Sequence, residues 1–306
     1  MINIEKSDTN GVKFSYQNKK QMEIKSLKNI DFDTLFSAFN QAFADYEMQL
    51  NEAQLKTMLK RRGFSADLSF AAFDGNDIVA FTLNGIGNFN GISTAYDTGT
   101  GTLKEYRGQG LATQIFEYSM PYLREANVEQ YLLEVLQHNT KAVSVYKNLG
   151  FKTTREFNYF VQKNEEINNT SKTFESSYSI EQIDIEKFKF VSDFWEFPPS
   201  WQNSFEAIKR ASEDFISIGF FAENKLVGYC VFEPISGDVT QIAVAQQHRR
   251  QGIATLLLQE MIKLNKNENL KILNTDILCH SITAFCKENN IDLKGKQFEM
   301  INERIF

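Results

Sequence analysis

Hydrophobic and polar residues follow two different periods along the first half of the chain, which predicts a mixture of strands and helices. Residues 22–27 alternate as in a strand, and apolar residues within 33–43 recur at helical spacings of one, three and four. Asparagine at the start and glycine just after the end predict a second helix over residues 51–62. Two apolar runs around a polar turn predict a β-hairpin over residues 70–83, followed by a strand over residues 94–103.

The second half of the chain repeats this order of elements. Residues 178–180 predict a strand, residues 185–194 and 204–211 predict helices, residues 219–232 a hairpin and residues 238–244 a further strand. Because the period is far longer than that of a solenoid, we interpret it as an internal repeat of whole domains.

The 306 residues are therefore predicted to form two domains of ordinary size. The predicted division is an N-terminal extension at residues 1–21, a first domain at 22–161, a linker at 162–177 and a second domain at 178–306. The linker is rich in Asn, Glu, Ser, Lys and Thr, a composition typical of solvated segments.

A short loop recurs at the same place in both halves, between a predicted strand and an apolar, helix-spaced segment. It reads Tyr-Arg-Gly-Gln-Gly-Leu-Ala at residues 106–112 and His-Arg-Arg-Gln-Gly-Ile-Ala at residues 248–254. Unpaired backbone N–H groups at a helix N-terminus attract an anion, and glycine lets a phosphate approach the backbone closely. A surface turn that opens an ordinary helix is the alternative. Two copies in matching surroundings favour a phosphate-binding loop.

The residues after the first loop extend the pattern. They are Tyr131-Leu132-Leu133-Glu134-Val135, Asn139, Ala142 and Tyr146-Lys147-Asn148-Leu149-Gly150-Phe151. In order and spacing the chain resembles the GNAT superfamily of N-acetyltransferases, whose Arg/Gln-x-x-Gly-x-Gly/Ala loop binds the pyrophosphate of acetyl-CoA. The resemblance implies an α/β (α+β) fold of two tandem domains, each a mixed, mostly antiparallel sheet flanked by helices. The implied residues that bind acetyl-CoA are Leu103, Arg107, Gly108, Gln109, Gly110, Leu111, Ala112, Thr113, Asn139, Arg249, Gly252 and Ala254.

Acetyl transfer to an amine needs both a base and an acid. The attacking amine must be neutral, and a lysine-like amine with a pKa of about 10.4 is neutral only about once in 2,500 molecules at pH 7. The departing CoA thiolate gains from a proton donor. By resemblance, Tyr146 is the candidate acid and Glu134 the candidate base; a packed tyrosine and a glutamate that only orders structure or water are the alternatives. Asn139 resembles an asparagine that contacts pantetheine, and a helix-capping role fits it equally well.

In this family the connection between the first two helices overhangs the acceptor site. Tyr46, Glu47 and Met48 are therefore the candidate substrate-binding residues for a small-molecule or peptide amine. The equivalent stretch of the second half, from Phe194 to Trp201, is expected to pack between the domains.

The second half departs from the family pattern after its loop. Phe285 or Cys286 falls where the tyrosine is expected. Gln241 and Ala243 stand where the first half has two strand glycines, which are expected to leave room for pantetheine, so the second site is expected to be the more crowded. We predict that this domain keeps a phosphate loop and has lost the transfer chemistry.

Composition narrows the classes of partner. The net charge of −6 gives no reason to expect nucleic acid or an anionic membrane. No apolar run reaches membrane-spanning length, and the start lacks a signal-peptide core, which predicts a cytoplasmic protein. The three cysteines form no disulfide framework, and Cys279, His280 and Cys286 fit no common zinc site, so no metal is expected. Packing of the halves as a pseudo-dimer predicts a monomer. A non-catalytic acyl-CoA-binding or sensing protein is the competing hypothesis.

Overall fold

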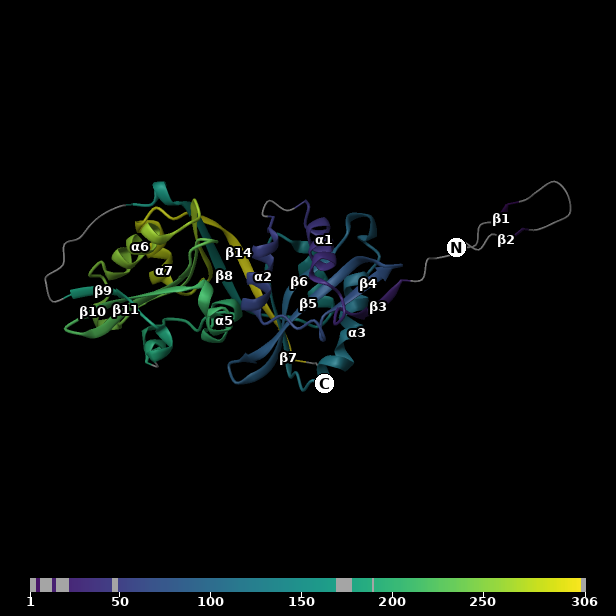
Figure 1. The fold of residues 1–306 in the computed structure, drawn as a ribbon, viewed down its shortest axis with the longest axis horizontal. Coiled ribbons are helices and arrows are strands. Elements are labelled where there is room, and N and C mark those ends of the chain that lie inside the picture. Colours follow the sequence, from purple (N-terminus) through teal and green to yellow (C-terminus); the bar gives the residue numbers. More distant parts are fainter. Residues whose placement is uncertain are drawn as a thin grey trace.

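One continuous sheet runs through both halves of the chain in the computed structural model (Figure 1). The structure describes residues 4–5, 13–14, 22–45, 49–168, 178–188 and 190–303, and within these the sheet has twelve strands. In spatial order the strands are β3 (Glu23–Ser26), β4 (Phe70–Asp74), β5 (Asp77–Phe89), β6 (Ile92–Thr102), β7 (Gln130–Leu136), β14 (Leu293–Asn302), β8 (Lys152–Lys163), β13 (Asn269–Asp276), β12 (Asp238–Val244), β11 (Lys225–Glu233), β10 (Ile216–Ala222) and β9 (Tyr178–Gln182). Strands β1 (Ile4–Glu5) and β2 (Lys13–Phe14) pair separately.

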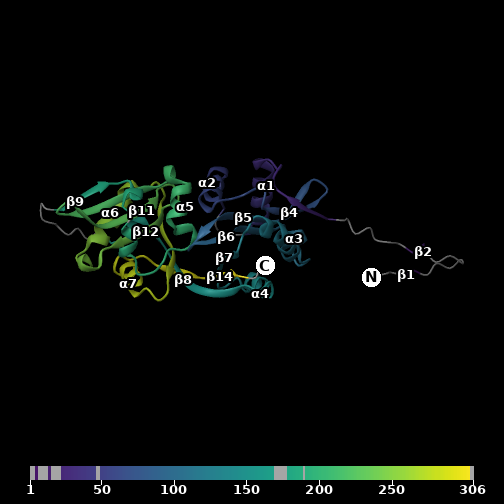
Figure 2. The ribbon, with the colours of Figure 1, turned by 90° about the horizontal axis from the view of Figure 1, so that it is seen from below.

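Helices cover both faces of this sheet. The described helices are α1 (Phe32–Ala42), α2 (Glu52–Arg62), α3 (Leu111–Glu125), α4 (Thr140–Asn148), α5 (Phe205–Arg210), α6 (Ile253–Leu264) and α7 (His280–Glu288). In the first half, α1 and α2 bury their apolar residues on one face, and α3 and α4 bury theirs on the other. Figure 2 shows α1 and α2 on the side opposite to α4. In the second half, α5 lies on one face and α6 and α7 on the other.

Local sequence signals account for the helix that was predicted over residues 51–62. The Asn51 side chain accepts from the Gln54 N–H, and the Gln54 side chain accepts from the Asn51 N–H, so two N-terminal amides are satisfied. Gly63 ends the helix in the left-handed region, at a φ of 79°.

The predicted helix over residues 185–194 is wrong. That stretch forms two 3₁₀ turns, Ile185–Lys187 and Val191–Phe194. Its apolar residues Ile185, Phe188, Val191 and Phe194 recur every three positions, and a 3₁₀ turn places residues three apart on one face, whereas an α-helix would rotate them off it. All four contribute to the core beneath β11.

The two halves exchange their last strands. Strand β14, the last of the second half, lies between β7 and β8 of the first half, and β8 pairs with β14 on one edge and with β13 on the other. The predicted domain boundary at residue 161 therefore falls inside β8. Beyond β8, Ile167 is buried in the second-half core, so the start of the predicted linker is packed. An Arg155 to Glu299 ion pair of 2.6 Å joins the exchanged strands.

Polar and aromatic side chains fill the contact between the halves. The buried Arg61 guanidinium on α2 donates to Asp238 Oδ2 at 2.5 Å and to the Gln202 carbonyl at 2.8 Å. Trp201 is fully buried and stacks on Tyr96, as expected for the 194–201 stretch, whereas Trp195 packs on Phe205 within the second half.

In each half, two neighbouring parallel strands pair only briefly and then separate. In the first half, β6 and β7 pair from Thr94 to Tyr96 and no further. In the second, β12 and β13 pair at Asp238 alone. The gap that opens past these points leads to the recurring loop, because the loop follows β6 in one half and β12 in the other.

Candidate functional site

The first loop presents backbone amides at the start of α3. Gly108 and Gly110 have φ angles of 77° and 74°, in the left-handed region that glycine adopts readily. Gly110 is the N-cap residue and makes no side-chain cap, so the N–H groups of Leu111, Ala112 and Thr113 begin the helix uncapped. Such a helix start favours a bound anion.

The arginine of the first loop holds the loop in place. Arg107 donates from Nε to the Thr102 carbonyl at 3.1 Å and from Nη2 to the Ala42 carbonyl at 2.9 Å, and Nη1 pairs with Asp45 at 3.0 Å. The side chain thus ties the end of β6 to the end of α1. The loop can therefore bind a phosphate mainly through its backbone N–H groups.

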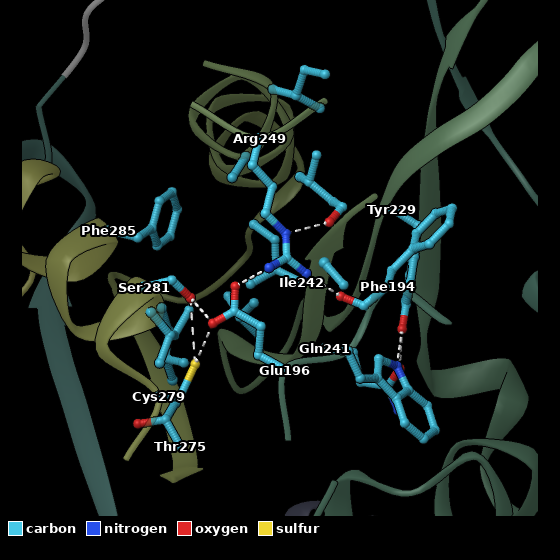
Figure 3. Close-up of a pocket in the computed structure, with 18 of the residues that line it drawn as sticks. Phe194, Glu196, Tyr229, Gln241, Ile242, Arg249, Thr275, Cys279, Ser281 and Phe285 are labelled. Carbon is cyan, nitrogen blue, oxygen red and sulfur yellow. Dashed lines mark hydrogen bonds and ion pairs between the residues drawn. The ribbon is translucent and has the colours of Figure 1, made fainter. Parts of the chain in front are cut away.

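The second loop is built the same way. Arg249 donates to the carbonyls of Val244 and Phe194, each at 2.9 Å, and pairs with the Glu196 carboxylate. Figure 3 shows Glu196 between Arg249 on one side and Ser281 and Cys279 on the other. The α6 helix starts at Gly252, with a φ of 95° and no side-chain cap.

Beside the second loop lies a cavity of about 380 Å³. Its walls come from the 194–199 stretch, from β12 and β13 where they separate, and from the first turns of α6 and α7 (Figure 3). The second site is therefore open, despite Gln241 and Ala243 in place of the two strand glycines. Two hydrogen bonds hold the Gln241 side chain: its amide donates to the Asn203 carbonyl at 2.6 Å, and its oxygen accepts from the Tyr229 hydroxyl at 2.7 Å.

One of the two strand glycines of the first half, Gly101, differs from expectation. A Cβ atom at Gly101 would lie 2.6 Å from the Phe81 ring and 2.9 Å from Ala42. Phe81 and Ala42 already occupy the space that the missing side chain leaves. Gly101 is thus required by packing of α1 on β5 and β6, and it does not make room for pantetheine.

Tyr146 reaches the point where β6 and β7 separate. It projects from α4, packs edge-on against Phe151 at 5.6 Å between ring centroids, and donates its hydroxyl hydrogen to Asp97 Oδ2 at 2.9 Å. Asp97 is the first β6 residue beyond the pairing with β7. Burial raises the pKa of the Asp97 carboxyl, and hydrogen bonds from Thr100 and Tyr146 oppose this rise.

Glu134 lies on the opposite face of the sheet from Tyr146. Its neighbours Leu133 and Val135 share the core that contains Tyr146, so the alternation of β7 directs Glu134 the other way, with Leu132. There its Oε2 accepts from the Tyr96 hydroxyl at 2.9 Å and the Gln202 amide at 2.8 Å. Burial raises the pKa of Glu134, and the Arg62 guanidinium opposes the rise. The structure does not bring the candidate acid and base together.

The other residues predicted to bind acetyl-CoA or the acceptor lie at different places in the fold. Asn139 caps α4, accepting from the Ala142 N–H at 3.3 Å, which matches the capping alternative. Leu103 packs against the core beneath α1. Gln109 is exposed in the loop. Tyr46, Glu47 and Met48 lie outside the described residues.

The sequence model of the acetyltransferase (GNAT) family matches residues 27–151 and again residues 178–281. The chain belongs to the GNAT family. The two matches fall on the two halves, each of which contains one copy of the loop. The predicted fold, two tandem GNAT domains built on a mixed sheet flanked by helices, is confirmed.

Three curated proteins that are similar in sequence are N-acetyltransferases, and each matches only a short segment of this chain. The chain is 35% identical over 60 residues to N-alpha-acetyltransferase 30 of Schizosaccharomyces pombe. The matched segment covers 19% of this chain and 40% of that protein. It is 34% identical over 65 residues to an N-alpha-acetyltransferase of Sulfurisphaera tokodaii, covering 21% and 39%. It is 26% identical over 95 residues to the N-acetyltransferase YobR of Bacillus subtilis, covering 31% and 36%. The chain thus matches less than half the length of these curated relatives.

Solved GNAT structures match almost the whole chain. A tandem GNAT protein from the clavulanic acid biosynthesis pathway has a TM-score of 0.70 at 12% identity, covering 92% of this chain and 98% of that one. A GCN5-related N-acetyltransferase from Sphaerobacter thermophilus has a TM-score of 0.68 at 12% identity, covering 92% and 95%. At such identities the likeness shows the fold.

In the second GNAT repeat a cysteine replaces the tyrosine. Tyr146 and Cys286 stand at the same position of α4 and α7, two helices of nine residues each. Cys286 is fully buried among apolar residues, and this burial raises the pKa of its thiol to about 12. Phe285, its neighbour, lines the cavity. The second repeat therefore combines an open cavity with a buried thiol at the position of the candidate acid.

Among the described residues, no helix combines the length and hydropathy needed to cross a membrane. In the same part of the chain, no three His, Cys, Asp or Glu side chains gather as a metal site would require.

Sequence reasoning missed three residues around the first site. Asp97 holds Tyr146, while Arg62 and Gln202 surround Glu134. Asp97 carried a weak signal, as an acidic residue within a strand of small and hydroxylated residues. Gln202 carried none, because its partner lies 68 positions away in the other half.

Proposed function

We propose that this GNAT protein is an acetyl-CoA-dependent N-acetyltransferase that moves an acetyl group directly to a primary amine, with the chemistry in the first half. The observation that carries the proposal is the Tyr146 hydroxyl at the point where β6 and β7 separate. The same strand, β6, ends in the phosphate-binding loop. A phenol proton and an anion site thus lie along one strand, as transfer from a phosphorylated thioester requires.

In this proposal the loop holds the pyrophosphate of the co-substrate acetyl-CoA. The N–H groups from Gly108 to Thr113 bind it, and Arg107 keeps the loop in shape through its bonds to Thr102 and Ala42. Hydrogen bonds from backbone amides to a charged group are worth about 1.5–3 kcal/mol each, so several amides suffice without a lysine.

The acid in this proposal is Tyr146, which gives its proton to the CoA sulfur. A CoA thiolate leaves more easily when it is protonated, and a positioned acid or base contributes about 10²–10⁴-fold. The family resemblance implies Glu134 as the base. The acceptor is proposed to be a small-molecule or peptide amine, and the pseudo-dimeric packing of the repeats supports a monomer.

The second half is proposed to bind acyl-CoA without transferring the acyl group. The cavity beside Arg249, Gly252 and Ala254 supports binding, and the buried Cys286 in place of a tyrosine leaves it without the acid. The same cavity favours a second candidate function for the whole chain, that of a non-catalytic acyl-CoA-binding or sensing protein.

The experiment is a panel of amines assayed for CoA release with the full chain. The intact chain is required because β8 and β14 are shared, so neither half keeps its own sheet. Tyr146→Phe should reduce kcat by about 10²-fold or more and leave acetyl-CoA binding unchanged. Tyr122→Phe, on the exposed side of α3, is the matched control. Parental turnover by Tyr146→Phe would refute the acid assignment.

A matched pair of loop variants separates the two halves. Gln109 and Gln251 are both exposed at the same loop position, and Gln→Glu adds a carboxylate where a phosphate should bind. Gln109→Glu should raise the KM for acetyl-CoA about tenfold, as expected for about 1.4 kcal/mol of repulsion. Gln251→Glu should leave that KM unchanged. The opposite result would assign the chemistry to the second half, and CoA binding without release by any amine would favour the sensing function.

A further inference from the structure

Asp97 stands at the tip of the gap between β6 and β7. The parallel pairing of the two strands ends at Tyr96, one residue earlier. On its other side Asp97 faces Asn84 of β5, next to a bulge that shifts the register at Leu83. A bulge re-aims the side chain beside it. Here the result is a carboxyl group at the point where the strands part.

The two oxygens of Asp97 differ in their surroundings. Oδ2 accepts from the Tyr146 hydroxyl and from the Thr100 hydroxyl, each at 2.9 Å. Oδ1 is buried and has no hydrogen-bond partner among the described residues. A buried carboxylate oxygen without a donor is unfavourable, since almost every buried polar atom in a folded protein is satisfied. An N–H donor arriving at the gap would satisfy it.

Glu134 also has one buried oxygen, Oε1, without a hydrogen-bond partner among the described residues, but the group lies on the other face of the sheet. Both recorded bonds to its Oε2 come from the face that contacts the second half, from Tyr96 and Gln202. Trp201 covers that face, because its ring stacks on Tyr96 at 5.2 Å. Of the two carboxylates, Asp97 is the one in contact with the candidate acid.

We propose that Asp97, rather than Glu134, is the catalytic base of the first half, and that Asp97 and Tyr146 together carry one proton from the amine nitrogen to the CoA sulfur. This inference rests on the proposed acetyltransferase function. Asp97 contacts the amine through Oδ1 and Tyr146 through Oδ2.

The step balances without any other reactant. The amine nitrogen forms a bond to the thioester carbonyl carbon, and the carbon–sulfur bond breaks, leaving its electron pair on sulfur. The proton released by nitrogen goes to Asp97. Tyr146 gives its hydroxyl proton to sulfur, and Asp97 passes the proton it received to the Tyr146 oxygen. The products are an amide and CoA thiol, and both side chains return to their starting forms.

The surroundings of Asp97 make its carboxylate a stronger base than an exposed one. The titratable and charged groups that interact electrostatically with it are Tyr146 on α4, Tyr131 on β7 and, from the other face of the sheet, Tyr96 on β6 and Arg62 on α2. Burial raises the pKa of Asp97, and a base whose pKa is closer to the working pH holds a transferred proton better. As a carboxylate base, Asp97 supports activity above its pKa, and kcat falls as the pH falls through that pKa.

The test compares carboxyl-to-amide variants of the full chain. Asp97→Asn keeps the size of the side chain and an oxygen for Tyr146, and it should reduce kcat by about 10²–10⁴-fold with acetyl-CoA binding retained. Its residual kcat should lose the acid limb of the pH profile. Asp74→Asn is the matched control, because Asp74 also accepts from a tyrosine, Tyr106, at 2.8 Å, and it should keep parental turnover. A loss confined to Glu134→Gln, with Asp97→Asn at the parental rate, would overturn the proposal.

A second readout needs no acceptor. The carboxyl ¹³C resonance that disappears in Asp97→Asn reports the ionisation of Asp97. We expect a carboxylate at pH 7.5, and a higher pKa in Tyr146→Phe, which removes a hydrogen-bond donor to the carboxylate. A carboxyl that is still protonated at pH 7.5 cannot take the amine proton and would overturn the inference. If no amine in the panel releases CoA, the acetyltransferase proposal fails, while this titration still decides whether Asp97 is a competent base.

Discussion

The indole ring of Trp201 lies nearly parallel to the phenol ring of Tyr96, with 5.2 Å between centroids and 7° between planes. Trp201 belongs to the second half and Tyr96 to the first, and the Tyr96 hydroxyl donates to Glu134. The indole N–H donates to the Arg62 carbonyl at 3.0 Å. One buried side chain thus connects the second half to β6, β7 and α2 of the first.

Trp201→Ala should destabilise the whole chain by about 3–5 kcal/mol, because it removes a fully buried aromatic side chain and leaves a cavity. The measurement is the free energy of unfolding in urea, followed by far-UV circular dichroism. Trp195→Ala, which truncates a half-buried tryptophan within the second half, is the control and should lose less. Equal losses in the two variants would argue against a special role for the contact between halves.

Arg61→Met should destabilise the chain by about 3–5 kcal/mol, because it leaves the buried Asp238 carboxylate without its partner. Adding Asp238→Asn should recover much of this loss, since the second change removes the uncompensated charge. Thermal unfolding of the two single variants and the double variant checks the pair. Lys56→Met, at an exposed pair with Glu52, should change stability by no more than about 0.5 kcal/mol. Additive losses at Arg61 and Asp238 would contradict the coupling.

Asp97→Asn should raise stability at neutral pH while it removes activity. Because burial raises the pKa of Asp97, the folded chain holds this proton to a higher pH than the unfolded chain does. Stability therefore falls as the pH rises from the ordinary carboxyl range through the raised pKa, and the loss persists above it. The amide has no proton to release and avoids this loss. Calorimetric Tm values between pH 4 and pH 8 should show the variant gaining on the parent chain as the pH rises; a constant difference would contradict it.

Cys279 should report occupancy of the second cavity. It lines the cavity with its sulfur 3.3 Å from Glu196, whereas Cys230 and Cys286 are fully buried. Burial raises the pKa of Cys279, so alkylation by iodoacetamide should be slow at pH 7 and faster at pH 9. Saturating CoA should slow it about tenfold, and Gln251→Glu should reduce this protection. Labelling that CoA does not change would show that CoA does not enter this cavity.

Local features of the fold were predictable because neighbouring residues determine them. The helix after Asn51 has its cap, its apolar spacing and its terminal glycine within thirteen positions. The hairpin of β4 and β5 has its turn between its own strands. The 185–194 stretch was not predictable in the same way. Apolar residues spaced three apart fit both a 3₁₀ turn and an irregular α-helix, and only tertiary packing selects between them.

The site was predictable as far as the family pattern extends. The loops, Asn139 and Tyr146 could be located from order and spacing, since these are properties of a linear pattern. The partners of Tyr146 and Glu134 could not, because alternation along β7 and the bulge in β6, where Thr98 is left unpaired, decide which face each carboxylate occupies. The open second cavity depends on where Gln241 finds hydrogen bonds, and those partners come from distant segments.

The sequence by itself determined that the chain contains two copies of one unit, each with a loop suited to phosphate, and that only the first retains a tyrosine after it. The tertiary structure decided that the copies share one sheet by exchanging β8 and β14, because the hydrogen-bonding edges of similar strands are interchangeable until side-chain packing selects partners. It also placed Asp97 beside Tyr146, and Glu134 beside Tyr96, on which Trp201 stacks, because contacts across long sequence separations are set only when the faces of the sheet are filled.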